Sequence, residues 1–233
     1  MRNKTANIEV IKTVARALGD INNRVVYVGG TVVALYADDP AAEDVRPTKD
    51  IDLVAQIVSI KELSQLEEKL GQRGFSRDPT ENLICRFRLG NILVDVMSTV
   101  EIGWAPSNRW FKSGMKHLRK VDVGDIEINI LDTPHFLAAK FEAFSGRGQN
   151  DPRTSQDFED IVYILDNNVG LAEEVLKAPT QVRKYLAKWF EEITESPTMK
   201  EALEAHLPYE TRAGRIAVIN DKLHKITKSY TSD

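Results

Sequence analysis

Apolar residues in the first half of the chain gather in short runs that have the length and composition of β-strands. They are rich in β-branched and aromatic residues and cover residues 25–28, 51–57, 82–89, 92–97, 118–123 and 126–131. Gly90-Asn91 and Gly124-Asp125 each join two neighbouring runs, and such dipeptides are typical of two-residue hairpin turns. The pattern predicts a mixed, mostly antiparallel sheet that includes two hairpins.

Helical periodicity separates these runs at first and then dominates the chain. In the first half it predicts helices over residues 8–18, 31–37 and 60–70, and Ser59 is a suitable N-cap for the third. From Thr133-Pro134 onward the sequence predicts only helices, over residues 134–144, 155–165, 171–178, 181–194, 198–206 and 210–227. We therefore expect an α+β fold, with the sheet in a domain of residues 1–131 and a helical domain over residues 132–233.

The composition narrows the class of protein without identifying it. With 233 residues, 42% of them hydrophobic and 28% charged, the chain has the make-up of an ordinary soluble globular protein. Its single cysteine, Cys85, excludes a disulfide framework and favours a reducing compartment. No apolar run approaches the length of a membrane span, so we expect a cytoplasmic protein with no membrane partner. The net charge of -4 argues against a protein that coats nucleic acid nonspecifically.

Two short motifs adjoin the first two predicted strands. Gly29-Gly30-Thr31 follows the first strand directly, where glycines let a phosphate approach the backbone amides of the turn. Asp50-Ile51-Asp52 opens the second strand, where a period of two places both carboxylates on one face. Taken singly, the first motif is typical of a tight turn and the second of a solvated edge or a cap. Their order and strand context favour a site for phosphates and Mg²⁺, which binds carboxylates together with substrate phosphates.

A third carboxylate is expected to complete such a site, and Asp95 is the candidate. It shares one face of its predicted strand with Leu93 and Met97. An aspartate in that setting is costly to bury without a partner, although it would also be stable facing water on a half-exposed hairpin. We predict that Asp50, Asp52 and Asp95 bind the metal.

In combination, these motifs resemble the nucleotidyltransferase superfamily, which includes DNA polymerase β and the aminoglycoside nucleotidyltransferases. The stretch Arg46-Pro-Thr-Lys-Asp-Ile-Asp52 is most similar to the AbiEii-like branch, the nucleotidyltransferase toxins of type IV toxin–antitoxin systems. The resemblance covers roughly residues 20–165. The sequence departs from the minimal superfamily pattern by an acidic insertion over residues 38–47, between the two motifs.

The resemblance implies a nucleotidyltransferase fold and an Mg²⁺-dependent enzyme that moves a nucleoside monophosphate from an NTP to a hydroxyl acceptor. It implies that Asp50, Asp52 and Asp95 are catalytic and hold the metal, while Gly29, Gly30 and Thr31 cradle the β- and γ-phosphates. It further implies RNA, such as a tRNA end, as the acceptor, a toxin-like or stress role, and a cognate antitoxin as a partner.

Two residues of the helical half join the predicted site through the same resemblance. The family has an active-site lysine on a helix and the first Asp of a Lys/Arg-Asp-x-x-Asp stretch, and these positions match Lys140 and Asp157. Gln156 stands where the family often has Lys or Arg. The residues alone also allow a lysine whose stem covers apolar surface, and first-turn acids, Asp157 and Asp160, that the helix dipole favours.

Residues 105–120 form a basic segment that contains no acidic residue. It holds Arg109, Trp110, Phe111, Lys112, Lys116, His117, Arg119 and Lys120. Such a composition can hold a triphosphate or a single-stranded end by charge and stacking, and a solvated basic loop explains it equally well.

Two other functions stay open at this point. The first is transfer to a small molecule of the aminoglycoside type, because the acidic loop of residues 38–44 would attract a polycationic substrate. The second is a binding module that has kept the carboxylates without catalysis and uses the basic segment to bind RNA or a partner protein.

Overall fold

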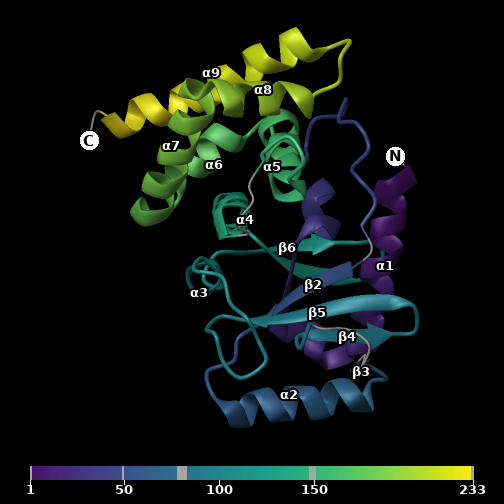
Figure 1. Ribbon diagram of the computed structural model, residues 1–233. Helices are drawn as coiled ribbons and strands as arrows, with labels where there is room; N and C mark the ends of the chain where they lie inside the picture. Colours follow the sequence, from purple (N-terminus) through teal and green to yellow (C-terminus); the bar gives the residue numbers. More distant parts are fainter. Residues whose placement is uncertain (1, 49, 78–82, 147–150, 232–233) are drawn as a thin grey trace. The chain divides into compact units, whose positions relative to one another are not determined.

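Figure 1 shows the computed structural model of the chain, which describes residues 2–48, 50–77, 83–146 and 151–231. The chain divides into two compact units. The first comprises residues 1–34 and 44–132, and the second comprises residues 35–43 and 133–233. The second unit thus includes a short piece of the chain that lies between the glycine turn and the Asp-x-Asp motif in sequence.

The described residues of the first unit form a seven-stranded sheet with the order β3-β4-β5-β2-β1-β7-β6. Its strands are β1 (Val25–Val28), β2 (Asp50–Ala55), β3 (Ser76–Arg77), β4 (Arg86–Leu89), β5 (Ile92–Ser98), β6 (Leu118–Asp122) and β7 (Glu127–Leu131). The pairs β1–β7 and β2–β5 are parallel, and the other neighbouring pairs are antiparallel. The predicted mixed, mostly antiparallel sheet and its two hairpins are confirmed.

Helical segments of the first unit precede, connect and flank these strands. They are α1 (Arg2–Leu18), η1 (Gly19–Arg24), the start of η2 (Gly30–Tyr36), α2 (Ile60–Gln72) and α3 (Phe111–Gly114). Helix α2 begins as predicted, because the Ser59 hydroxyl accepts a hydrogen bond from the Glu62 backbone N–H at 3.2 Å. It runs beside β3 and β4 (Figure 1), where Glu67 accepts a hydrogen bond from Arg77 Nε at 2.7 Å.

Several elements differ from the sequence prediction for identifiable reasons. The helix expected over residues 31–37 is a tighter 3-10 helix, η2. The strand expected over residues 82–89 begins only at Arg86, because Ile84 and Cys85 form a turn; Asn82 lies outside the described residues. Helix α1 begins at Arg2 instead of residue 8, since the Asp44 carboxylate accepts hydrogen bonds from the first backbone N–H groups of that helix.

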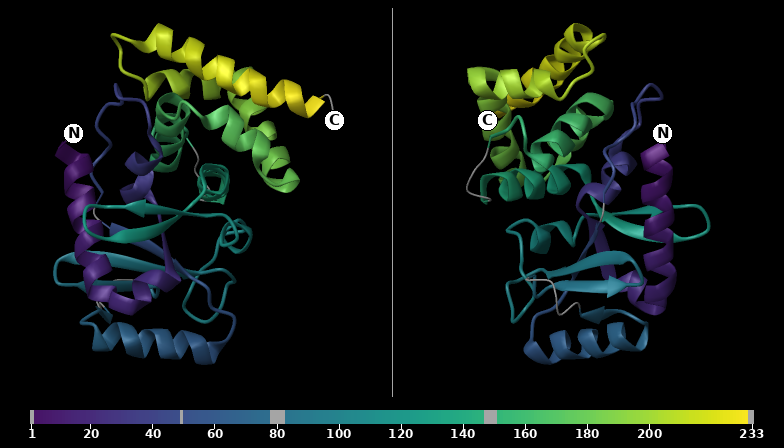
Figure 2. Two further views of the ribbon diagram at one scale, coloured as in Figure 1. Left: turned by 180° about the vertical axis from the view of Figure 1, so that it is seen from behind. Right: turned by 45° about the vertical axis from the view of Figure 1, so that its right-hand side comes forward.

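The second unit is helical, as the sequence predicts. Its helices are α4 (Thr133–Gly146), α5 (Gln156–Asn167), α6 (Leu171–Lys177), α7 (Thr180–Glu195), α8 (Pro197–Ala205) and α9 (Arg212–Thr231). Serines cap two of them: Ser155 accepts from the Phe158 N–H at 3.3 Å and Ser196 from the Met199 N–H at 3.4 Å. Helix α9 packs against α5, α6 and α7, and Figure 2 shows it from two further sides. None of the helices in the described part of the chain is both long and apolar enough to cross a membrane.

The acidic segment before Asp44 is a structural part of this helical unit. The backbone N–H groups of Asp38 and Asp39 both donate to the Asn167 carbonyl at 3.1 Å. In return, the Asp38 carboxylate accepts a hydrogen bond from the Val169 N–H at 2.7 Å, and Asn168 Nδ2 donates to the Tyr36 carbonyl at 3.0 Å. The segment is therefore held at the end of α5 by hydrogen bonds, and the Asp38 carboxylate takes part in them.

Candidate active site

The glycine turn after β1 makes room for two charged side chains. Gly29 has φ +75°, a left-handed conformation that side-chain-bearing residues rarely adopt. A Cβ atom at Gly29 would overlap the Asp52 carboxylate, and one at Gly30 would overlap the Arg46 guanidinium. Glycine is required at both positions because the chain passes so close to these groups.

Thr31 links the turn to the Asp-x-Asp motif. Its side chain is buried, and its hydroxyl donates a hydrogen bond of 2.7 Å to the backbone carbonyl of Asp50. This bond fixes the start of β2 relative to the turn. The hydroxyl thus positions the first carboxylate, while the predicted contact between the turn and phosphates remains a prediction.

Strand pairing brings the three predicted metal ligands to one place. Asp52 on β2 lies opposite Val28 on β1 and directly beside Asp95 on the parallel strand β5. Directly paired residues project from the same face of a sheet, and Asp50 shares that face because it precedes Asp52 by a strand period of two. The prediction that Asp50, Asp52 and Asp95 gather at one site agrees with this register.

Arg86 completes the same row of residues, and it was not singled out from the sequence. It lies opposite Asp95 in the β4–β5 hairpin. Its Nε and Nη2 atoms donate to the two carboxylate oxygens of Asp95, each at 2.7 Å, and Nη2 also reaches Asp50 Oδ2 at 3.3 Å. The Arg86 side chain is 13% exposed and that of Asp95 12%, so the pair is largely shielded from water. A bidentate pair of this kind is strong and geometrically specific.

The donor set of this cluster fits a hard cation. All three side chains offer carboxylate oxygens, the ligands that Mg²⁺ prefers, and a triphosphate can supply the remaining oxygens. Within the described residues, no three His, Cys, Asp or Glu side chains already converge as a metal cage. The Arg86 guanidinium lies between Asp50 and Asp95 and supplies the positive charge there.

Cys85, next to this cluster in sequence, does not have the properties of a nucleophile. Burial of the thiol, and to a smaller extent the negative charge of Asp95, raises the pKa of Cys85 above its ordinary value. The thiol is therefore protonated at neutral pH.

Lys140 and Asp157 are brought together in the second unit. Lys140 Nζ on α4 donates to Asp157 Oδ1 at 3.1 Å and to Asp160 Oδ2 at 2.7 Å on the neighbouring helix α5. The three side chains are at most 9% exposed. They form a buried ion cluster, which is more than the snorkelling lysine and first-turn acids that the residues alone also allowed. The sequence motif assigned no role to Asp160, yet its contact with Lys140 is shorter than that of Asp157.

The basic segment of residues 105–120 offers charge but not stacking. Lys112, Lys116 and His117 are exposed, whereas Trp110 and Phe111 are 3% and 4% exposed and belong to the core. Of the two interpretations that the sequence left open, stacking of these rings on nucleotide bases does not agree with the structure, because the apolar rings are packed inside the unit. Lys120 forms an ion pair of 2.6 Å with Glu127 on β7.

Comparison with known proteins adds the decisive observation. The sequence model of a family described as "Nucleotidyl transferase AbiEii toxin, Type IV TA system" matches residues 15–220. The chain belongs to this family. It is accordingly a nucleotidyltransferase of the EC 2.7.7 type and a toxin component of a type IV toxin–antitoxin system, which confirms the resemblance seen in the motifs. Membership in the AbiEii family also implies an NTP as the donor and an antitoxin as the partner.

Solved structures similar to this AbiEii family member are distant in sequence. One is an antigenic nucleotidyltransferase-like protein from Paracoccidioides brasiliensis, with 16% identity and a TM-score of 0.47, covering 85% of this chain and 92% of that one. Another is JHP933 from Helicobacter pylori, with 10% identity and a TM-score of 0.46, covering 95% of each chain. No curated protein matches the sequence. The assignment to the AbiEii family therefore depends on the family match over most of the chain.

Proposed function

We propose that this AbiEii family member transfers a nucleoside monophosphate from an Mg²⁺-bound NTP to a hydroxyl group of RNA, such as a tRNA end. The observation that carries the proposal is the position of Asp52 directly beside Asp95, with Asp50 on the same face and the Gly29-Gly30 turn alongside. Carboxylates next to a glycine turn suit a metal-bound triphosphate.

The proposed step is an in-line displacement. The acceptor oxygen forms a bond to the α-phosphorus, the bond from that phosphorus to the bridging oxygen breaks, and pyrophosphate leaves with the negative charge. Mg²⁺, when bound, supplies positive charge that offsets the charge developing on the phosphates. Asp50, Asp52 and Asp95 would hold it, and Asp95 would also take the acceptor's proton or help to take it.

Arg86 sets a condition on the role of Asp95. Both oxygens of Asp95 accept hydrogen bonds from the guanidinium, so both are engaged by Arg86 in this structure. In the proposed reaction the guanidinium must therefore release at least one oxygen before Asp95 takes a proton. Gly29, Gly30 and Thr31 would meanwhile cradle the β- and γ-phosphates with their backbone N–H groups.

Lys140 and Asp157 are proposed to serve the nucleotide. Lys140 would neutralise charge of the triphosphate, and Asp157 would orient the lysine or contact the nucleotide. Their direct contact in the second unit supports a shared role, because an ammonium held by two buried carboxylates has a fixed position. The two residues belong to a different unit from the three carboxylates on the sheet.

Charge favours RNA over a small polycation as the acceptor. The exposed Lys112, Lys116 and His117 give the first unit a basic surface that can track a phosphate backbone. The acidic loop suggested the aminoglycoside-type alternative, but two of its carboxylates accept hydrogen bonds from backbone N–H groups of the protein itself. Asp38 accepts a backbone hydrogen bond from Val169, and Asp44 accepts two from the start of α1.

The test is incubation of the purified protein with each α-³²P-labelled NTP, Mg²⁺ and total cellular RNA, followed by a denaturing gel. We expect a labelled RNA band that is absent for Asp52→Asn and Asp50→Ala, whereas the fold of both variants is retained. Mg²⁺-dependent labelling by either variant would contradict the assignment of the carboxylates. Lys112→Gln/Lys116→Gln should weaken RNA labelling without changing the thermal stabilisation by Mg²⁺ and NTP.

A negative labelling result is also informative. If Mg²⁺ and NTP stabilise the fold but RNA is not labelled, the result would still support a transferase. It would indicate a small molecule or a protein, and not RNA, as the acceptor. If no NTP stabilises the fold and RNA binding is salt-sensitive, the result would favour the binding module over the enzyme.

A further inference from the structure

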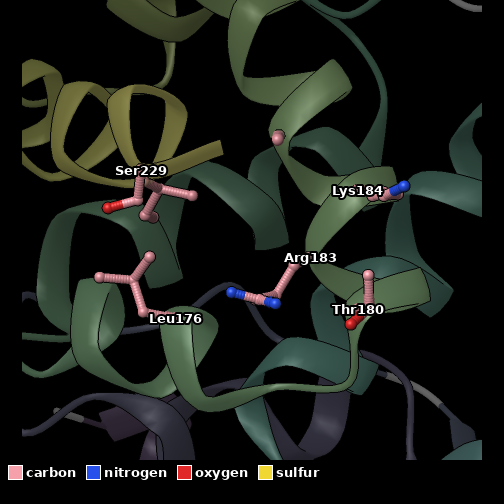
Figure 3. A pocket seen from close by; sticks show the side chains of 7 residues that line it. Leu176, Thr180, Arg183, Lys184 and Ser229 are labelled. Atoms are coloured by element: carbon pink, nitrogen blue, oxygen red, sulfur yellow. The ribbon is translucent and has the colours of Figure 1, made fainter. Parts of the chain in front are cut away.

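A pocket in the helical unit lies between the helices α6, α7 and α9, each of which contacts the other two. Its volume is about 410 Å³, and it is lined by Leu176, Thr180, Arg183, Lys184, Ala187, Ile226 and Ser229 (Figure 3). All of these residues belong to the second unit, so the pocket is independent of the carboxylate cluster on the sheet. The volume is in the range of small-molecule binding sites and exceeds what a single inorganic ion fills.

The lining is apolar on one side and cationic on the other. Leu176, Ala187 and Ile226 supply the apolar wall, whereas Arg183 and Lys184 supply positive charge and Thr180 and Ser229 supply hydroxyl groups. Among the described residues that line the pocket, none is acidic. The close view shows the Arg183 guanidinium extending from α7 into the space between Leu176, Thr180 and Ser229 (Figure 3).

One N–H group of the Arg183 guanidinium, that of Nε, is buried without a hydrogen-bond partner among the described residues. Acidic residues are present on the flanking helices α6 and α9, but each of them contacts other groups. Glu173 pairs with Lys177, and Asp221 pairs with Lys225. Glu174 accepts hydrogen bonds from the Thr133 hydroxyl and from Asn168 Nδ2. A buried N–H donor of a permanent cation, with no acid among the described residues that line the pocket, indicates an anionic ligand.

The start of α7 adds to the positive potential of the pocket. The helix has 16 residues, its first turn contains no acidic residue, and its N-cap residue, Pro179, makes no side-chain capping hydrogen bond. Thr180 and Arg183 lie in this first turn, so the positive end of the helix dipole and the guanidinium meet at the same pocket.

We propose that this pocket is a second binding site of the chain, for a small organic anion. A phosphate or carboxylate group of the ligand contacts the Arg183 guanidinium and the start of α7. An apolar body fills the remaining space against Leu176 and Ile226. The fork of N–H donors in a guanidinium matches two oxygens of such a group, which a lysine cannot do.

The experiment titrates the full-length protein in EDTA with phenyl phosphate, inorganic phosphate and benzyl alcohol, and follows backbone amide signals by NMR. We expect saturable shifts of the amides of residues 180–184 with phenyl phosphate, and at least tenfold weaker binding of the other two compounds, which lack either the apolar body or the charge. Arg183→Gln should weaken phenyl phosphate at least tenfold, and Arg183→Lys should restore only part of that loss.

Two further variants keep the test decisive. Lys188→Gln, on the same helix but not among the pocket residues, should bind phenyl phosphate like the wild type. Ser229→Trp alters an exposed rim residue and should block the pocket while the fold is kept. Equal binding by the wild type and Arg183→Gln would overturn the proposal. Shifts confined to the Gly29-Gly30-Thr31 amides, or no binding at millimolar concentrations, would overturn it too.

Discussion

Replacing Arg86 by Gln should destabilise the first unit and make divalent cations bind to it more tightly. The guanidinium donates to both Asp95 oxygens at 2.7 Å and to Asp50 Oδ2 at 3.3 Å, and a glutamine side chain is too short and uncharged to do the same. The variant leaves the carboxylates of Asp50, Asp52 and Asp95 beside one another with one positive charge fewer. Such carboxylates repel unless another cation lies between them.

The size of the effect follows from burial. Arg86 and Asp95 are 13% and 12% exposed, so their interaction is only weakly screened by water. Removing one partner of a fully buried pair costs about 3–5 kcal/mol, and the remaining exposure here lowers our expectation to about 2–4 kcal/mol. Asp50, at 40% exposure, adds little to this sum. The melting temperature should fall by roughly 5–15 °C for a chain of this size.

The assay compares thermal unfolding and Mn²⁺ titration calorimetry of wild type and Arg86→Gln, both without NTP. Mn²⁺ at saturation should restore most of the lost stability, and its Kd for the variant should be at least tenfold lower than for wild type. Arg77→Gln is the matched control. Arg77 pairs with Glu67 at 2.7 Å and lies opposite Phe87, whose side chain projects from the face opposite to Arg86. Its loss of stability should not respond to Mn²⁺.

Two results would refute this reasoning. Unfolding of Arg86→Gln at the wild-type temperature would mean that the guanidinium does not hold the carboxylates in solution. Equal Mn²⁺ affinity of the variant and wild type would mean that it does not compete with the cation. The first result concerns the stability of the cluster, and the second concerns its role as a metal site.

Two further predictions concern other ion pairs. Lys140→Met should cost about 3–5 kcal/mol in urea unfolding, because it removes the ammonium that donates to the buried carboxylates of Asp157 and Asp160, and the added changes Asp157→Asn and Asp160→Asn should recover most of it. A Lys140→Met variant as stable as wild type would contradict the buried cluster. The hydrogen bond from Arg77 is the main cause that lowers the pKa of Glu67 below its ordinary value of 4.5. This carboxylate therefore contributes stability at pH values above 4.5, and the contribution disappears as the pH falls through the lowered pKa. Glu67→Gln should lose less stability than wild type over that acid range, and parallel pH profiles of the two proteins would count against the ion pair.

Local sequence determined much of the secondary structure and even one contact that we did not predict. Apolar runs define β1, β2, β5, β6 and β7 to within two residues at either end, and Ser59 and Ser155 cap the helices α2 and α5. The two-residue turn Gly90-Asn91 pairs Leu89 with Ile92, and this register places Arg86 opposite Asp95. The arginine partner of Asp95 was therefore already contained in the sequence, because a short turn fixes the register of the whole hairpin.

The motifs also identified the family and the three carboxylates, but they did not show how these carboxylates are arranged in space. Periodicity assigns a residue to a face of its own strand and contains no information about which distant strand becomes its neighbour. The parallel pairing of β2 with β5 brings Asp52 beside Asp95, and only the folded sheet decides it. The same applies to Lys140 and Asp157, whose contact requires α4 to pack on α5.

Long-range contacts likewise overruled several local expectations. The Asp44 carboxylate caps α1 across a gap of about forty residues, so the helix begins earlier than its own sequence indicates. Trp110 and Phe111 are part of the core although their basic neighbours are exposed. In each case the free energy that decides the outcome comes from burial or from a hydrogen bond between segments far apart in sequence. The sequence alone specifies which groups are available, and the tertiary structure decides which of them meet.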